Sequence, residues 1–238
     1  MSRIRSGLSG YSYPEWKGEG KLYPPKLSSK DFLRFYAERY DALEAVGTFA
    51  HLPIEKMVTK WIEETPEEFR VCPKMHQRVT HFQRLKPESL ERVEEMAKAL
   101  EPIRKTGKLG PILIQLPPNL KRNDHLLDTF LGQLPVGFQW AVEFRHETWN
   151  DPVVEALLRA YGIAWVAADT DEDDVPRRDT ADFHYVRLRK SEYDDAALVE
   201  WAGYLRSTGK PGFVFCRHTD IPAPWLWADR LVELLGRP

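Results

Sequence analysis

Charged residues recur at intervals of two within short apolar segments of this 238-residue chain. Glu143 and Arg145 are two residues apart, and so are Arg187 and Arg189. In an extended strand, residues two apart point to the same face. Arginine binds phosphates and carboxylates through parallel hydrogen bonds, and a neighbouring carboxylate can act as a general base. These pairs therefore predict an anion-binding site with acid–base chemistry.

Eight short apolar segments, rich in β-branched and aromatic residues, would hold these side chains in place as strands. They cover residues 4–9, 42–46, 69–74, 112–116, 139–144, 163–168, 183–188 and 212–216. Helical patterns lie at residues 30–40, 55–64, 90–103, 124–131, 152–158, 196–205 and 225–235. This alternation is typical of βαβ units that build a parallel sheet.

The number of strands and the chain length together predict the fold. Eight strands alternating with helices in about 240 residues match a TIM-like (β/α)8 barrel, so we expect one α/β barrel domain over residues 1–238. The segment 169–182 is charged and contains proline, which predicts a loop in place of the sixth helix and hence an irregular barrel. A doubly wound open α/β sheet is the alternative, because a strand count does not show closure.

Functional side chains of such barrels gather at the C-terminal ends of the strands. The polar residues expected there are Glu44, Lys74, Gln115, Glu143, Arg145, Asp169, Arg187 and Arg189. The three acidic residues are candidates for a general base, and the other five are candidates for ligand binding. Four cations against three carboxylates leave a surplus positive charge, which predicts a small anionic ligand such as a phosphate. Structural ion pairs within the ring are the alternative.

Aromatic residues crowd the segment that follows the first strand, GLSGYSYPEWKGEGKLYPP. Its glycines and prolines predict a loop on the same face of the barrel. Tyr11 and Trp16 are therefore candidates for stacking on the sugar or base of a ligand. The same aromatic residues would equally well plug the top of the barrel.

Histidines raise the question of a divalent metal cofactor. His81, His146 and His218 follow the third, fifth and eighth strands, and with Glu143 and Asp169 they form a donor set that suits zinc or manganese. No HxH or HExxH spacing supports this set, so no residue is assigned as a metal ligand and the cofactor is left open. His81 is kept as a candidate ligand-binding residue.

The overall composition limits the classes of partner. Lys and Arg number 34 against 36 Asp and Glu, a net charge of −2, so nucleic-acid binding would need a local patch. No apolar run approaches the roughly 20 residues of a membrane span, and the N-terminus lacks the apolar middle of a signal peptide. We therefore expect a soluble cytoplasmic protein without a membrane partner. Cys72 and Cys216 lie in predicted strands, as small core side chains.

Several segments around the strand ends, taken in order, resemble the family called domain of unknown function 72, or YecE-like proteins. The matching segments are GLSGYSYPEW, LYPPKL, LEAVGTFAHLP, TPEEFRVCPK, VTH, ILIQLPP, VEFRHETW, YVRLRK and LVEWAGYL. The resemblance spans nearly the whole chain and implies a TIM-barrel-like fold with a site at the C-terminal face. It implies no particular reaction, although such barrels are distantly similar to metal-dependent sugar isomerases and to DNA-repair endonucleases of the endonuclease IV type.

The chain departs from this family pattern at the predicted site. Val46 and Ala50 stand where the pattern has an asparagine and a tyrosine, and Arg189 stands where it has a histidine. Arg217 lies in a segment that is usually rich in asparagine. Neutral polar groups are lost and basic groups are gained, so the resemblance implies altered specificity or loss of a family activity.

Three hypotheses for function follow. The first is an enzyme, or former enzyme, that acts on a phosphorylated or other anionic compound with hydrolase- or isomerase-type chemistry. The second is a nucleic-acid-binding or endonuclease-like protein, which depends on fold analogy and on aromatic residues beside basic ones. The third is a binding module without chemistry, which the departures at Val46 and Arg189 favour. The oligomeric state is left open.

Overall fold

The computed structural model describes residues 3–172, 176–217 and 223–236. Its strands are β1 (Ile4–Ser9), β2 (Ala42–Ala45), β3 (Arg70–Pro73), β4 (Ile112–Gln115), β5 (Trp140–Glu143), β6 (Ala164–Trp165), β7 (Ala167–Asp169), β8 (His184–Leu188) and β9 (Gly212–Cys216). Its α-helices are α1 (Phe32–Arg39), α2 (Glu55–Glu63), α3 (Leu90–Lys105), α4 (Asp124–Leu131), α5 (Pro152–Ala160), α6 (Asp195–Ser207) and α7 (Pro224–Leu235). The structure contains the predicted strands and helices with small shifts at their ends. The sixth predicted strand is divided into β6 and β7.

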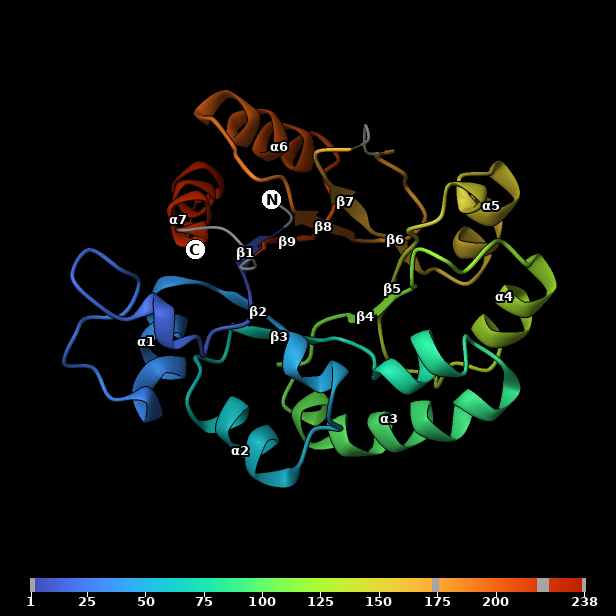
Figure 1. Ribbon diagram of the computed structural model, residues 1–238, viewed down its shortest axis with the longest axis horizontal. Helices are drawn as coiled ribbons and strands as arrows, with labels where there is room; N and C mark the ends of the chain where they lie inside the picture. Colours follow the sequence, from blue (N-terminus) through green and yellow to red (C-terminus); the bar gives the residue numbers. More distant parts are fainter. Residues whose placement is uncertain (1–2, 173–175, 218–222, 237–238) are drawn as a thin grey trace.

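The strands form two parallel sheets. The larger has the order β3-β2-β1-β9-β8-β7, and the smaller has the order β4-β5-β6. Within each sheet, neighbours along the chain are mostly neighbours in space, and β1 at the start of the chain pairs with β9 near its end. Figure 1 shows the strands in the middle of the molecule with the helices around the outside. Because the pairings are parallel, the carboxyl ends of the strands in each sheet lie at one edge.

The two sheets are connected on both sides. On one side Lys74 forms a parallel bridge with Leu113, and the Met75 N–H donates a hydrogen bond of 2.7 Å to the Leu113 carbonyl. On the other side the chain passes directly from β6 to β7 through Val166, whose N–H donates to the Val142 carbonyl in β5 at 2.9 Å. The predicted α/β fold with parallel strands is confirmed, while neither sheet closes on itself across the described residues.

Capping side chains define where helices begin. Asn123 accepts a hydrogen bond from the Leu126 N–H at the start of α4, and Asp151 accepts one from the Val153 N–H at the start of α5. Between β7 and β8, residues 170–172 and 176–183 contain no helix, in agreement with the loop predicted from their charge. Across the described ranges, no helix is both long and apolar enough to cross a lipid bilayer.

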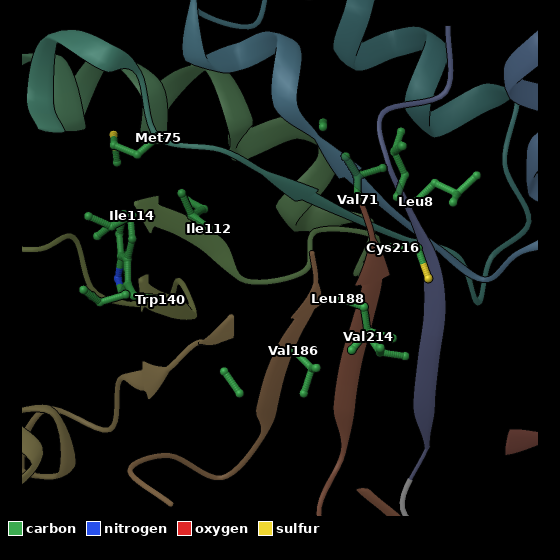
Figure 2. Packing of buried hydrophobic residues seen from close by; sticks show 14 of the residues in the cluster. Leu8, Val71, Met75, Ile112, Ile114, Trp140, Val186, Leu188, Val214 and Cys216 are labelled. Carbon is green, nitrogen blue, oxygen red and sulfur yellow. The ribbon is translucent and has the colours of Figure 1, made fainter. Parts of the chain in front are cut away.

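Side chains on the two faces of the strands form two separate apolar clusters. The outer cluster includes Leu8, Val71, Ile114, Val186 and Val214, which Figure 2 shows along the strands. The inner cluster consists of alternate residues, among them Ala42, Cys72, Leu113, Ala141, Ala164, Val166, Tyr185 and Phe215. Burial of one aliphatic side chain contributes about 1.5–3 kcal/mol, so both faces stabilise the strands.

One helix side chain enters the sheet itself. The Tyr36 hydroxyl, from α1, accepts a hydrogen bond of 2.6 Å from the Leu8 N–H in β1 and donates one of 3.0 Å to the Ala42 carbonyl in β2. A Cβ atom at Gly7 would lie 2.7 Å from that hydroxyl and 1.9 Å from that carbonyl oxygen, so only glycine fits. The contact anchors α1 to the first two strands and helps to position Glu44 in β2.

Candidate functional site

Polar side chains continue the inner face of the strands beyond the inner apolar cluster, toward the carboxyl ends. They follow inner apolar residues at an interval of two, so that Glu44 follows Ala42 and Arg187 follows Tyr185. The resulting strand-end cluster consists of Glu44, Lys74, Gln115, Glu143, Arg145, Arg187 and Arg189. The structure therefore brings together the whole predicted ring except Asp169.

Arg187 lies at the centre of the strand-end cluster, with 6% of its side chain exposed. One terminal nitrogen donates to the Glu143 carboxylate and, at 3.1 Å, to the Gln115 Oε1, while the other donates to the Glu44 carboxylate at 2.9 Å. The Tyr185 hydroxyl donates to the second Glu44 oxygen at 2.9 Å. Burial lowers the pKa of Arg187, but the two carboxylates outweigh burial and raise it. Arg187 thus links β8 to β2, β4 and β5 as a buried cation.

Glu143 is 1% exposed and accepts hydrogen bonds from three arginines. Arg145 donates at 2.8 Å and Arg189 at 3.3 Å to one carboxylate oxygen, while Arg187 occupies the other. Burial raises the pKa of Glu143, but the guanidinium groups, led by Arg187, lower it to about 2. A carboxylate with this pKa is a weak proton acceptor at neutral pH, so the geometry favours Glu143 as a positioning residue.

Lys74 stands apart from these pairs. Its ammonium nitrogen lies 4.0 Å from the centre of the Phe49 ring and has no hydrogen bond or ion pair with any residue that the structure describes. Burial, followed by the nearby Arg187 guanidinium, lowers the pKa of Lys74 to about 8. The oxygens of Glu44 and Glu143 are already bonded to arginine and tyrosine, so they do not pair with this lysine.

Arg145 and Arg189 form the outer edge of the cluster, with 28% and 15% of their side chains exposed. Arg145 also donates a hydrogen bond of 3.0 Å to the Gln115 Oε1. The Nε atoms of Arg187 and Arg189 are buried and have no hydrogen-bond partner in the described part of the chain. Burial lowers the pKa of Arg189 to about 10, and the Glu143 carboxylate compensates only in part. An anion at this edge would therefore relieve an unfavourable concentration of positive charge.

The charges of the strand-end cluster do not balance. Four cations face two carboxylates, namely Lys74, Arg145, Arg187 and Arg189 against Glu44 and Glu143, which leaves two surplus positive charges. The surplus is one larger than in the predicted ring, because Asp169 lies elsewhere. Unpaired charge in a partly buried site is unfavourable unless a ligand of opposite charge binds there.

Asp169 points away from the cluster, unlike its predicted position in the ring. Its carboxylate accepts a hydrogen bond of 3.0 Å from the Trp201 indole in α6 and pairs with Lys190 at 3.2 Å. Val166 and Ala168 contact the inner apolar cluster, so Asp169, one residue further, has the opposite parity. Asp169 therefore anchors α6 to β7, and its carboxylate has no hydrogen bond or ion pair with the strand-end cluster among the described residues.

Aromatic residues of the loop after β1 are packed into the structure. Trp16 is 2% exposed, and its ring centre lies 6.0 Å from that of Trp225 in α7. Tyr11 packs against Tyr36 of α1, with 6.3 Å between ring centres, and its carbonyl accepts a hydrogen bond from Tyr23. For both candidates, the geometry favours packing over stacking on a ligand.

His81 contacts Phe49, the ring over which the Lys74 amine lies. Its ring meets the Phe49 ring edge-on, with 4.9 Å between centres, and its Nδ1 is 2.8 Å from the Thr80 hydroxyl. Burial, followed by the charge of Lys74, lowers the pKa of His81. The imidazole is therefore predominantly neutral at neutral pH and able to accept a proton.

The described members of the donor set considered for a metal do not come together. The His146 imidazole instead accepts a hydrogen bond from the Thr148 N–H in the short helix Glu147–Trp149, and Asp169 faces α6. His218 lies outside the described residues. Within residues 3–172, 176–217 and 223–236, no group of three or more His, Cys, Asp or Glu side chains is arranged to hold a metal ion.

Two residues of the site were not among the sequence candidates. Tyr185 donates a hydrogen bond to Glu44 from the inner face of β8. Its position two residues before Arg187 is the sequence signal that places it on this face. Phe49 lies in a 3-10 helical turn after β2, where a strand pattern gives no information. Thr48 holds this turn against β3 by donating a hydrogen bond of 2.6 Å to the Lys74 carbonyl.

The fold and the strand-end cluster define an α/β protein with a charged site at the carboxyl edge of parallel sheets. The family model described as "Protein of unknown function DUF72" matches residues 5–238, and the chain belongs to this family. The resemblance to YecE-like proteins is thereby confirmed.

Two curated relatives carry the family designation UPF0759. Protein YunF of Bacillus subtilis is 29% identical over 185 residues, which are 72% of this chain and 62% of YunF. Protein YecE of Escherichia coli K12 is 30% identical over 144 residues, which are 60% of this chain and 48% of YecE. The matched region thus spans about half to three-fifths of the length of these relatives.

Solved structures of the family have the same fold. A DUF72 family protein from Thermotoga maritima superimposes with a TM-score of 0.81 at 22% identity, covering 99% of this chain and 100% of that one. One from Enterococcus faecalis superimposes with a TM-score of 0.80 at 16% identity, covering 99% and 96%. At these identities the likeness shows the fold alone, so any function must be argued from the site.

Proposed function

We propose that this protein binds a small anionic ligand, carrying a phosphate or carboxylate group, at the strand-end cluster. The observation that carries the proposal is the surplus of two positive charges in a partly buried site. Arg145 and Arg189 are partly exposed there, and the Lys74 amine has no acidic partner within the described chain. These three cations would surround the anion.

The proposed frame of the site is a single (β/α)8 barrel domain over residues 1–238, interrupted between β3 and β4 and between β6 and β7. The β1–β9 pairing and the connections between the two sheets support this arrangement. In barrels of this kind, ligands bind at the carboxyl ends of the strands, where the strand-end cluster lies.

Both carboxylates of the cluster would orient the arginines, and Glu143 would not take up a proton. Glu143 has a pKa of about 2, and both oxygens of Glu44 accept hydrogen bonds. Hydrolase- or isomerase-type chemistry at this site would need a proton acceptor with a higher pKa. Lys74, with a pKa of about 8, meets this requirement.

Isothermal titration with inorganic phosphate tests the proposal. We expect the wild-type protein to bind phosphate, and Arg189→Gln or Arg145→Gln to weaken binding about tenfold or more, because hydrogen bonds to charged groups contribute about 1.5–3 kcal/mol. Arg230→Gln is the matched control, since Arg230 in α7 pairs only with exposed carboxylates among the described residues. Absence of phosphate binding by the wild-type protein would contradict the proposal.

Two further measurements separate this function from its alternatives. Single- and double-stranded DNA are expected to show no retention in a gel-shift assay at low salt, because the net charge is −2. Retention of DNA that depends on Arg145 or Arg189 would favour a nucleic-acid-binding protein. Recovery of every bound phosphorylated compound unaltered would favour a binding module without chemistry.

A further inference from the structure

We propose that Lys74 is a nucleophile that forms an imine with an aldehyde or ketone carrying a phosphate or carboxylate group. This inference rests on the proposed anion site and names its substrate class. Lys74 directly follows β3 at the carboxyl edge of the sheet, and its amine lies 4.0 Å from the Phe49 ring centre. No acidic group in the described chain forms a hydrogen bond or an ion pair with this amine.

The surroundings of Lys74 increase the fraction of neutral amine, the form that a nucleophile requires. Burial is the largest cause, and the pKa of Lys74 is lowered to about 8. About a tenth of the amine is then neutral at pH 7, whereas well under 0.1% of an ordinary lysine is neutral. The charged and titratable groups that act on it are the cations Arg187 and Arg145, the carboxylates Glu44 and Glu143, and the imidazole of His81.

The Phe49 ring brings a second reactive group to the same place. The Lys74 amine lies over this ring, and the His81 ring meets it edge-on with 4.9 Å between centres. A neutral imidazole beside the amine can accept the proton that the amine loses when it attacks a carbonyl group. His81 would thus act as the proton-transfer group for Lys74.

The reaction balances without an oxidant or reductant. The amine electron pair forms a C–N bond to the carbonyl carbon, and the carbonyl oxygen is protonated. The proton lost by nitrogen passes to His81 and is returned to the hydroxyl group, which leaves as water when the C–O bond breaks. The nitrogen electron pair then forms the C=N bond. Amine, carbonyl compound and one proton therefore yield a protonated imine and one water molecule.

The arginines at the edge of the cluster explain why the carbonyl compound should also be an anion. Arg145 and Arg189 are partly exposed in the same cluster as Lys74, and their positive charges repel each other. A phosphate or carboxylate bound by these arginines would hold the rest of the molecule close to the amine. Positioning of this kind is a large part of catalysis in reactions between two molecules.

Borohydride trapping tests the inference with pyridoxal 5′-phosphate as the probe, because this aldehyde carries a phosphate and borohydride reduces its imine to a stable amine. We expect peptide mass spectrometry to find at least about tenfold more adduct at Lys74 than at Lys190, because the Lys74 amine belongs to the same cluster as Arg145 and Arg189 and has a lowered pKa. Lys190 is a suitable reference because its side chain is 40% exposed and pairs with Asp169. Pyridoxal without phosphate is expected to lose the preference, and excess inorganic phosphate to suppress it.

The variant Lys74→Arg separates the imine from the anion site. It is expected to bind inorganic phosphate within about threefold of the wild-type affinity, because it keeps the positive charge, and to give no adduct at position 74. Lys190→Arg is expected to leave labelling of Lys74 unchanged.

Two results distinguish failure of the inference from failure of the proposed function. Equal labelling of Lys74 and Lys190 in a protein that binds inorganic phosphate would overturn the imine and leave the anion site intact. No phosphate binding and no preferential labelling would overturn both. Should Lys74→Arg fail to fold, the pH dependence of wild-type labelling decides, with a midpoint near 8 expected and a midpoint near the ordinary 10.5 contradicting the inference.

Discussion

The two sides of the strand-end cluster deal with buried charge in opposite ways. On the Arg187 side, the guanidinium donates hydrogen bonds to the carboxylates of Glu44 and Glu143. The Tyr185 hydroxyl donates to the second oxygen of Glu44. On the Lys74 side, the amine faces an aromatic ring at 4.0 Å and no carboxylate of the described chain. The first side is an ion-pair network, and the second holds a cation that has no acidic partner among the described residues.

The contrast shows why a ring of charges should not be assigned one role as a whole. A paired buried charge supports the fold, since removal of one partner leaves the other unpaired. A buried cation without a partner lowers stability, so its removal should have the opposite sign. Measurements of stability on the two sides therefore test the comparison directly.

Arg187→Met is expected to have the largest effect, a loss of about 3–5 kcal/mol in the free energy of unfolding. The variant leaves two buried carboxylates without their shared cation. Urea unfolding followed by tryptophan fluorescence measures the loss, and Arg159→Gln at an exposed position of α5 is the control. If Arg187→Met were as stable as the wild-type protein, the Arg187 side would not be structural.

Acid should remove a contribution of about 3 kcal/mol that depends on Glu143, since one pKa unit corresponds to about 1.4 kcal/mol. Its pKa is lowered from 4.5 to about 2 in the folded state, so the stabilisation is present above pH 4.5 and is lost as the pH falls toward 2. Unfolding free energies at pH 7 and pH 3 should therefore differ less in Glu143→Gln than in the wild-type protein. Glu233→Gln, at an exposed position in α7, should keep the wild-type pH dependence.

Lys74→Met is expected to raise the free energy of unfolding by about 1–2 kcal/mol at pH 7. The pKa of Lys74 is lowered from 10.5 to about 8, so the unfolded state binds more protons between these values. The wild-type protein should therefore gain stability as the pH rises from 8 to 10.5, and the advantage of the variant should shrink over that range. Thermal melts at pH 7 and pH 10 measure this. A destabilised variant at pH 7 would mean that the lysine serves the fold.

Arg189→Gln is expected to have the smallest effect on stability, under about 1 kcal/mol, because Arg189 contributes one of the surplus charges and makes a single long bond of 3.3 Å to Glu143. The same variant should lose phosphate affinity, so a large effect on binding should accompany a small effect on stability. Chemical unfolding and phosphate titration of one preparation provide both values. Loss of stability comparable to that of Arg187→Met would place Arg189 in the structural network instead.

Much of the fold and of the site could be predicted because strand alternation is a local property. Residues two apart in a strand share a face wherever the strand is placed, which put Glu143 with Arg145 and Arg187 with Arg189. The prediction for Asp169 is wrong because a position at the end of a strand does not fix the face on which the side chain lies. That face depends on the alternation along the strand. The small inner side chains Ala164 and Ala168 show that the opposite face of this segment meets a helix.

The sequence alone specified the α/β class, the family, and most of the charged residues that end on the inner face. Only the tertiary structure decided how these charges are paired. Arg187 meets a carboxylate 143 positions away, at Glu44, and thereby occupies the acidic group that Lys74 would otherwise pair with. The physical reason is that alternation depends on neighbouring residues, whereas the partner of a charge depends on strand order and register, which the packing of the whole molecule determines.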